Sequence, residues 1–123
     1  MKSKQQLRRR ADKIWGRLIL ELYMNKCFVC GAKAIDPHHF IPKGRCAKLR
    51  YNLDNGVALC RKCHIKHHWH SDPTIVATIV EKKGKDWYRK IKKMFQNAQK
   101  QKSNSFLTKK YYEEVINKLT TLA

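Results

Sequence analysis

The chain has 123 residues, of which 28 are Lys or Arg and 9 are Asp or Glu, for a formal net charge of +19. This length fits one domain and excludes a second independent core, while the excess charge predicts a polyanionic partner, with nucleic acid as the first expectation. No run approaches the roughly 18 apolar residues of a membrane span and the N-terminus lacks an apolar signal core, so we expect a cytoplasmic protein with no membrane partner.

The first predicted element is a basic N-terminal helix within residues 1–26. Apolar residues recur at steps of three and four from Leu7 to Leu22, which marks one face of a helix that ends near Asn25. The other face is rich in Lys and Arg. We expect the apolar face to pack against the rest of the domain.

Two matched cysteine pairs follow. Cys27-Phe-Val-Cys30 and Cys60-Arg-Lys-Cys63 each place two thiols at a two-residue spacing, and 29 residues separate them. Two such turns complete the tetrahedral four-thiolate site that zinc prefers, so we predict a structural Zn²⁺ with no position open to substrate. A redox dithiol or ordinary buried cysteines would not explain two matched pairs. Cys46 is left over as a small loop residue.

All six histidines lie between residues 38 and 70. His64 and His68 are one helical turn apart, a spacing that suits two ligands of one metal, and His67 competes with His68 for the second position. If His38 and His39 lie in a strand, their side chains point to opposite faces, so one can bind the metal. The other, His39, is then free to act as a general base, with an ordinary pKa of about 6.5.

Helices are predicted after the histidines. Asp72 as N-cap, Pro73 at the first helical position and Gly84 as a stop predict one helix, and apolar residues from Trp87 to Phe95 predict a second short one. We interpret the aromatic residues at helical spacing as core residues rather than base-stacking platforms.

The C-terminal part is expected to contain a linker and a last helix. Residues 96–106 are polar and lack a period, so we interpret them as a fraying helix end and a linker. Thr108 can cap a helix whose apolar face runs from Tyr112 to Leu119, with Leu107 packing against Tyr112 as a hydrophobic staple.

These motifs, taken in their order along the chain, resemble those of a known protein family. The stretches "HHFIP" and "NLDNGVALCRKCH", with the flanking cysteine pairs, resemble the HNH family of nucleases, in the zinc-bearing branch of the ββα-metal fold, over roughly residues 27–70. This resemblance implies an α+β protein: a treble-clef-like core with structural zinc over residues 27–72, flanked by the N-terminal helix and by a helical extension over residues 73–123.

The resemblance also implies roles for individual residues. It makes His38 and His64 ligands of a catalytic divalent metal, with His68 as the third ligand. It makes His39 the general base, and it makes Asn55 the residue that braces the hairpin and orients the base. The implied activity is hydrolysis of DNA phosphodiester bonds to leave 5′-phosphate and 3′-hydroxyl ends. Three imidazoles favour Mn²⁺, Ni²⁺, Co²⁺ or Zn²⁺ by affinity, and cellular abundance keeps Mg²⁺ among the candidates.

Basic residues in or beside this segment are expected to contact phosphates without reading the base sequence. They are Arg45, Lys48, Arg50, Arg61, Lys62 and Lys66.

A narrower resemblance covers "LRYNLDN" and the tail that includes "GKDWYRKIKK", which are similar to phage NinG/Rap-like recombination nucleases. It implies a branched-DNA substrate, recombination proteins as partners and a bacterial or phage-infected host cell. Two alternatives to a nuclease stay open. One is a zinc-containing nucleic-acid-binding module without catalysis, and the other is a recombination accessory protein that works through its helical tail.

Overall fold

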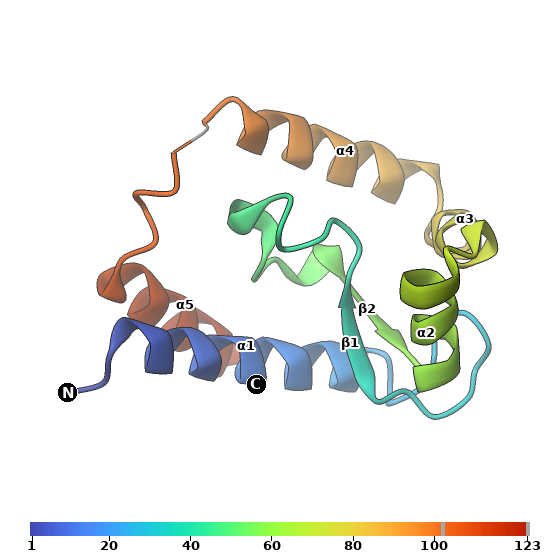
Figure 1. The fold of residues 1–123 in the computed structure, drawn as a ribbon, viewed down its shortest axis with the longest axis horizontal. Coiled ribbons are helices and arrows are strands. Elements are labelled where there is room, and N and C mark those ends of the chain that lie inside the picture. Colours follow the sequence, from blue (N-terminus) through green and yellow to red (C-terminus); the bar gives the residue numbers. More distant parts are fainter. Residues whose placement is uncertain (102, 123) are drawn as a thin grey trace.

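Helices surround a two-stranded sheet in the computed structural model, which describes residues 1–101 and 103–122 (Figure 1). The α-helices and strands are α1 (Lys4–Leu22), β1 (Asp36–His39), β2 (Gly56–Leu59), α2 (Arg61–His70), α3 (Pro73–Lys83), α4 (Lys85–Gln99) and α5 (Lys109–Leu122). Two 3₁₀ turns, Ala47–Leu49 and Leu53–Asn55, lie in the connection between the strands. This content confirms the α+β prediction. Among the described residues, no helix is long and apolar enough to cross a membrane.

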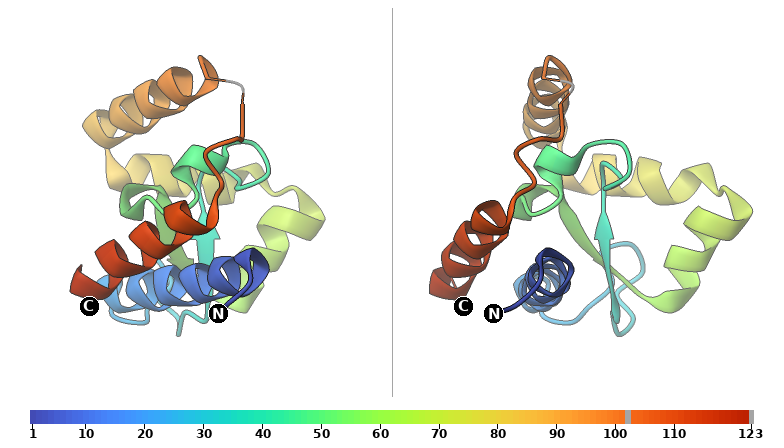
Figure 2. Two further views of the ribbon diagram at one scale, coloured as in Figure 1. Left: turned by 90° about the vertical axis from the view of Figure 1, so that its left-hand side faces the viewer. Right: turned by 60° about the vertical axis from the view of Figure 1, so that its left-hand side comes forward.

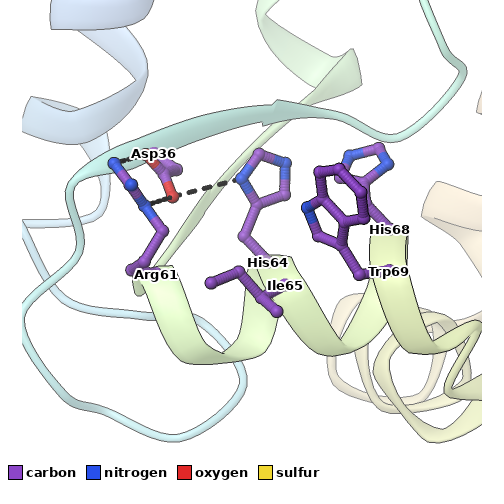
Figure 3. Close-up of a pocket in the computed structure, with 6 residues that line it drawn as sticks. All are labelled: Asp36, Arg61, His64, Ile65, His68 and Trp69. Atoms are coloured by element: carbon purple, nitrogen blue, oxygen red, sulfur yellow. Dashed lines mark hydrogen bonds and ion pairs between the residues drawn. The ribbon is translucent and has the colours of Figure 1, made fainter.

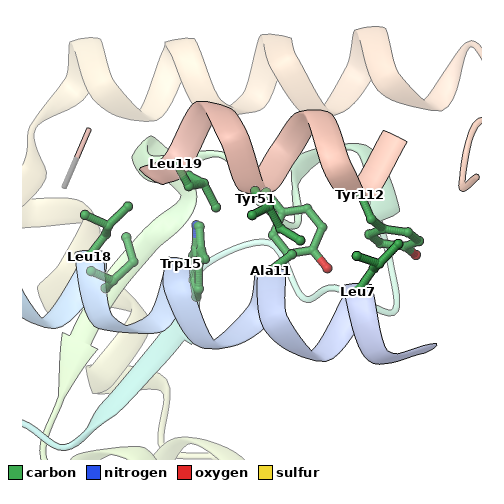
Figure 4. Close-up of a cluster of buried hydrophobic side chains, with 9 residues drawn as sticks. Leu7, Ala11, Trp15, Leu18, Tyr51, Tyr112 and Leu119 are labelled. Carbon is green, nitrogen blue, oxygen red and sulfur yellow. The ribbon is translucent and has the colours of Figure 1, made fainter. Parts of the chain in front are cut away.

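Helix α1 packs its apolar face against α5. It begins at a capping box in which the Ser3 hydroxyl accepts from the Gln6 backbone N–H and the Gln6 side chain accepts from the Ser3 N–H. Buried side chains between the two helices form one of the two hydrophobic clusters (Figure 4). The helix ends at Leu22, three residues before the predicted end, because Met24 and Asn25 adopt positive φ angles of 54° and 57° that a helix does not allow.

Strands β1 and β2 pair antiparallel, with His38 opposite Val57 and His39 opposite Gly56. The sheet lies between α1 and α5 on one side and α2 and α3 on the other (Figure 2). Gly56 allows α1 to approach closely, because a Cβ there would lie 2.6 Å from Ile19 Cγ1 and 2.9 Å from Trp15 Cζ2. The hairpin is therefore seated directly on α1.

The helices after the histidines begin as predicted. The Asp72 side chain accepts from the Thr74 N–H at 2.9 Å, Pro73 opens α3, and Gly84, at φ 93°, separates α3 from α4. Helix α4 continues to Gln99, so the first residues of the stretch 96–106 form the end of a helix, as predicted. Thr108 Oγ1 accepts from the Tyr111 N–H at 3.1 Å, as expected of a residue that caps α5.

Candidate functional site

The four paired cysteines meet in one cluster. The sulfur atoms of Cys27, Cys30, Cys60 and Cys63 all lie within 4.8 Å of one another, and the Cys30 and Cys60 sulfurs are 3.6 Å apart. Zinc–sulfur bonds of about 2.3 Å in a tetrahedron give sulfur–sulfur edges of about 3.8 Å, so the cluster fits one zinc ion. All five cysteines are reduced, and Cys46 lies outside the cluster.

Local backbone geometry holds both pairs in place. The first pair lies in a turn closed by the Cys27 N–H donating to Ala32 O and by the Gly31 N–H donating to Cys27 O. Gly31 has a φ of 81°, which explains why a glycine follows the pair. In the second pair, Cys60 is the N-cap of α2, and its sulfur accepts from the Cys63 N–H.

The thiols differ in how readily they ionise. Burial opposes ionisation of Cys27, but hydrogen bonds from backbone groups of Cys60, Cys30 and Val29 outweigh it and lower its pKa to about 7. Burial raises the pKa of Cys63. Thiolates packed this closely repel one another, and a bound cation relieves that repulsion.

A second cluster joins β1 to α2. Donor nitrogens of His38, His64 and His68 all lie within 4.8 Å of one another. The His67 ring centroid is 4.9 Å from that of His38, but no His67 nitrogen belongs to the group. Burial, followed by the neighbouring imidazoles, lowers the pKa of His38 to about 3, so this side chain is neutral and can act as a metal ligand. The spacing within the cluster fits a single divalent metal.

Asp36 orients one of these imidazoles, and sequence reasoning missed it. His64 Nδ1 lies 3.1 Å from Asp36 Oδ2, which also accepts from Arg61 Nε at 2.9 Å (Figure 3). A carboxylate partner places the proton on Nδ1 and leaves His64 Nε2 for a metal. Asp36 lies two residues before His38 in β1, on the same face of the strand, and that spacing was the signal available in the sequence.

His39 points to the other face of β1, against α1. Its ring stacks on the indole of Trp15, with the ring centroids 4.0 Å apart and the planes 9° from parallel. His39 Nε2 lies 2.9 Å from Arg50 O, and because a carbonyl can only accept, Nε2 carries the proton and Nδ1 keeps its lone pair. Burial lowers the pKa of His39 to about 4, below the ordinary value that the sequence alone suggested.

A residue of α1 fixes the carbonyl that orients His39. Asp12 accepts from Arg50 Nε at 2.9 Å and from Arg50 Nη2 at 2.6 Å, and from the Tyr51 hydroxyl at 2.8 Å. Burial, followed by Asp12, raises the pKa of Tyr51, so its hydroxyl stays protonated as the donor. The carboxylate thus anchors the backbone at Arg50. Sequence reasoning also missed Asp12, whose only signal was an acidic residue within the basic stretch from Arg8 to Lys13.

Asn55 ties down the loop that follows β1. The side chain is fully buried, and its Oδ1 accepts from the Ile41 N–H at 2.7 Å. Its Nδ2 donates to Ile41 O at 3.0 Å and to Leu49 O at 3.2 Å, so one amide joins both ends of the segment between them. Phe40 N–H also donates to the Asn55 carbonyl. The residue thus fixes the backbone just after His39, at Ile41, and just before His39's hydrogen-bond partner Arg50, at Leu49.

The basic residues expected at phosphates fall into two groups. Arg45, Lys62 and Lys66 are exposed. The guanidinium of Arg50 pairs with Asp12 and that of Arg61 pairs with Asp36, while Lys48 donates to Gln101. The paired side chains of Lys48, Arg50 and Arg61 link parts of the fold. Because their charges are already partnered, they should attract a phosphate less strongly than the exposed side chains do.

Comparison with known proteins agrees with this geometry. Residues 27–69 match a family model described as HNH endonuclease, and this segment contains the cysteine cluster and the histidine cluster. Neither curated proteins nor solved structures gave a match. The match supports the HNH resemblance for these residues, whereas nothing supports the narrower resemblance to NinG/Rap-like nucleases.

Proposed function

We propose that the chain is a metal-dependent DNA endonuclease of the HNH type, which hydrolyses phosphodiester bonds to 5′-phosphate and 3′-hydroxyl ends. The observation that carries this proposal is that two neighbouring histidines of β1 face opposite sides of the strand and have different surroundings. His38 faces His64 and His68, while the adjacent His39 faces α1 with its Nδ1 lone pair unused. A metal site and a general base therefore lie next to each other along the chain.

His38, His64 and His68 would hold the divalent metal, since their nitrogens converge and Asp36 fixes the tautomer of His64. When bound, the metal supplies Lewis-acid stabilisation of the charge that develops on the phosphoryl oxygens and on the leaving 3′ oxygen. Mn²⁺, Ni²⁺, Co²⁺, Zn²⁺ and Mg²⁺ are the candidates. Cys27, Cys30, Cys60 and Cys63 would hold a separate structural zinc.

His39 would act as the general base. Its Nδ1 takes a proton from the attacking water, and the oxygen of that water forms the new bond to phosphorus. Stacking on Trp15 and the bond to Arg50 O hold the ring in one orientation, so little ordering is needed at the moment of reaction. Asn55 keeps the loop that carries Arg50 in place. Arg45, Lys62 and Lys66 would contact backbone phosphates, with Lys48, Arg50 and Arg61 contributing less.

Two other functions compete with this one. A zinc-containing binding module without catalysis would need the cysteines and the positive charge, but it has no use for a stacked, neutral histidine beside three convergent imidazoles. A recombination accessory protein would act through α4 and α5. The branched-DNA substrate and the recombination partners rest on the narrower resemblance alone.

Cleavage assays on linear duplex, single-stranded and branched DNA test the proposal, with each divalent metal added in turn. We expect metal-dependent cutting that leaves ends which a ligase can rejoin directly, because 5′-phosphate and 3′-hydroxyl groups are its substrates. Binding of all three DNAs without cutting under any metal would favour the binding module. If a chain that lacks residues 100–123 still cleaves DNA, α5 is not required for the cleavage activity.

A further inference from the structure

Trp69 is a tryptophan that the fold leaves uncovered. Its exposed fraction is 81%, against 2% for Trp15. Trp87 is half-buried, and its indole N–H donates to Asp54 O at 3.0 Å. Trp69 is thus an exception to the expectation that aromatic residues at helical spacing belong to the core. An indole left in water contributes little to folding, and it points to a ligand only where it belongs to a larger apolar surface.

The position of Trp69 links it to the candidate metal site. It follows His68 in α2 and lines an open hollow together with His64, His68 and Ile65 (Figure 3). Ile65 lies one helical turn before Trp69 and is itself 37% exposed, so the two side chains form one apolar surface. A strand held at the histidines would pass beside this surface.

The charge around the hollow identifies the kind of ligand. The charged residues that line the hollow itself, Arg61 and Asp36, pair with each other. The unpaired positive charge comes from Lys62 and Lys66, which are exposed on the same helix, and α2 has no Asp or Glu. A flat aromatic side chain among cations matches a strand of phosphates and bases, the combination used by proteins that bind single-stranded nucleic acid. A second copy of this chain fits poorly, because two molecules of net charge +19 repel each other.

We propose that Trp69, backed by Ile65, is a stacking platform for one unpaired nucleobase next to the scissile phosphate. This inference rests on the proposed function and deepens it, because it names the substrate class. In a continuous duplex both faces of each base are covered by its neighbours. DNA that offers a free base face, such as a single strand, a frayed end or a junction, is the substrate that such a platform selects.

A binding measurement tests this without relying on cleavage. The zinc-loaded full chain, with no other divalent metal added, is titrated into short single-stranded DNA containing one 2-aminopurine, and into a relaxed closed circular duplex that contains the same sequence and has no ends. Loss of one base–aromatic stack corresponds to roughly 5- to 150-fold weaker affinity. We expect Trp69→Ala to weaken single-strand binding by that factor, to abolish the 2-aminopurine quenching, and to leave duplex affinity unchanged. Trp69→Phe should retain most of both signals.

The matched control is Tyr88→Ala, which removes an exposed aromatic ring from α4, outside the hollow. This variant should bind both DNAs as the wild type does. Wild-type affinity of Trp69→Ala for single strands, or an equal loss on both DNAs, would overturn the stacking platform, as would a wild-type dimer that Trp69→Ala abolishes. If Trp69→Ala behaves as expected but no DNA is cut under any metal, the nuclease proposal fails and the base-binding site stands.

Discussion

At the scale of single residues, the surroundings of His39 decide how it titrates. The ring is packed on Trp15, and its environment includes Lys43 and Arg50, so both burial and positive charge disfavour the protonated form. The pKa falls to about 4, and His39 is neutral over the whole physiological range. A general base must be neutral to accept a proton, so acid should inhibit it only well below pH 6.

This shift predicts the pH dependence of cleavage. Single-turnover rates at saturating metal should change little between pH 7 and pH 6, and the fall that accompanies protonation of His39 should be centred near its pKa of about 4. The unperturbed value of about 6.5 would place the fall within the neutral range. If the cleavage rate instead fell around the unperturbed pKa, either His39 would be more exposed to solvent than the structure shows, or another group would act as the general base.

Asp12 gives a second prediction at this scale. Asp12→Ala leaves the Arg50 guanidinium and the Tyr51 hydroxyl without their shared acceptor, which should lower the free energy of unfolding by about 1–3 kcal/mol. The lower end is favoured because Asp12 and Arg50 are partly exposed. Urea unfolding of the zinc-loaded chain measures this. Asp86→Ala is the control, because the Asp86–Arg89 pair is largely exposed and should contribute nothing measurable. Equal unfolding midpoints for the two variants would contradict the role given to Asp12.

At the scale of elements, the close packing of the β1–β2 hairpin against α1 depends on Gly56. A Cβ there would overlap Ile19 and Trp15, so Gly56→Ala should displace α1 from β2 and destabilise the fold by about 1–3 kcal/mol. Trp15 also stacks on His39, so the cleavage rate should fall as well. Gly44→Ala is the control, since a Cβ at Gly44 meets no atom within 4 Å and no positive φ is involved. Thermal melting compares the two, and a Gly56→Ala melting temperature equal to that of Gly44→Ala would rule out the close approach.

We expect the turn that precedes β1 and the start of α2 to depend on zinc. Structural zinc binding contributes roughly 10–16 kcal/mol in small zinc-finger peptides, which is comparable to the stability of a whole domain. Cys60→Ser should therefore lose the zinc and unfold the site region, whereas Cys46→Ser, at a buried position outside the cluster, should keep it. Metal analysis with thermal melting separates the two variants. A Cys60→Ser chain with one zinc and an unchanged melting temperature would refute the assignment.

The sequence was informative where chemistry depends on local spacing. Both cysteine pairs and the opposite faces of His38 and His39 follow from turn and strand geometry, and the capping residues of α3 are read directly from Asp72 and Gly84. Asp12 and Trp15 could not be assigned in this way, because they meet His39 and Arg50 only after α1 packs on the hairpin. The pKa of His39 depends on the same packing. The end of α1 was placed too late because its apolar period continues into residues that adopt positive φ.

At the scale of the whole molecule, the site extends beyond the segment that matches the family. Residues 27–69 contain both clusters, yet the ring that stacks on His39 and the carboxylate that anchors Arg50 come from α1. Helix α5 in turn packs on α1 (Figure 4). Both terminal helices therefore help to hold the residues that contact His39 and Arg50. In the proposed function the excess of positive charge serves DNA binding, which should persist when the chemistry is removed.

The central claim is that one strand presents a metal ligand and a general base on opposite faces, and a single variant tests it most directly. His39→Ala should lower the cleavage rate by about 10²- to 10⁴-fold, because general-base assistance is worth that much. Metal content and DNA affinity should stay at the wild-type level, since the donors of both metal clusters and the exposed cations are untouched. The control is His70→Ala, which removes an exposed imidazole at the end of α2 outside the donor group and should cut at the wild-type rate. Cleavage by His39→Ala at the wild-type rate, with the same metal bound, would contradict the account.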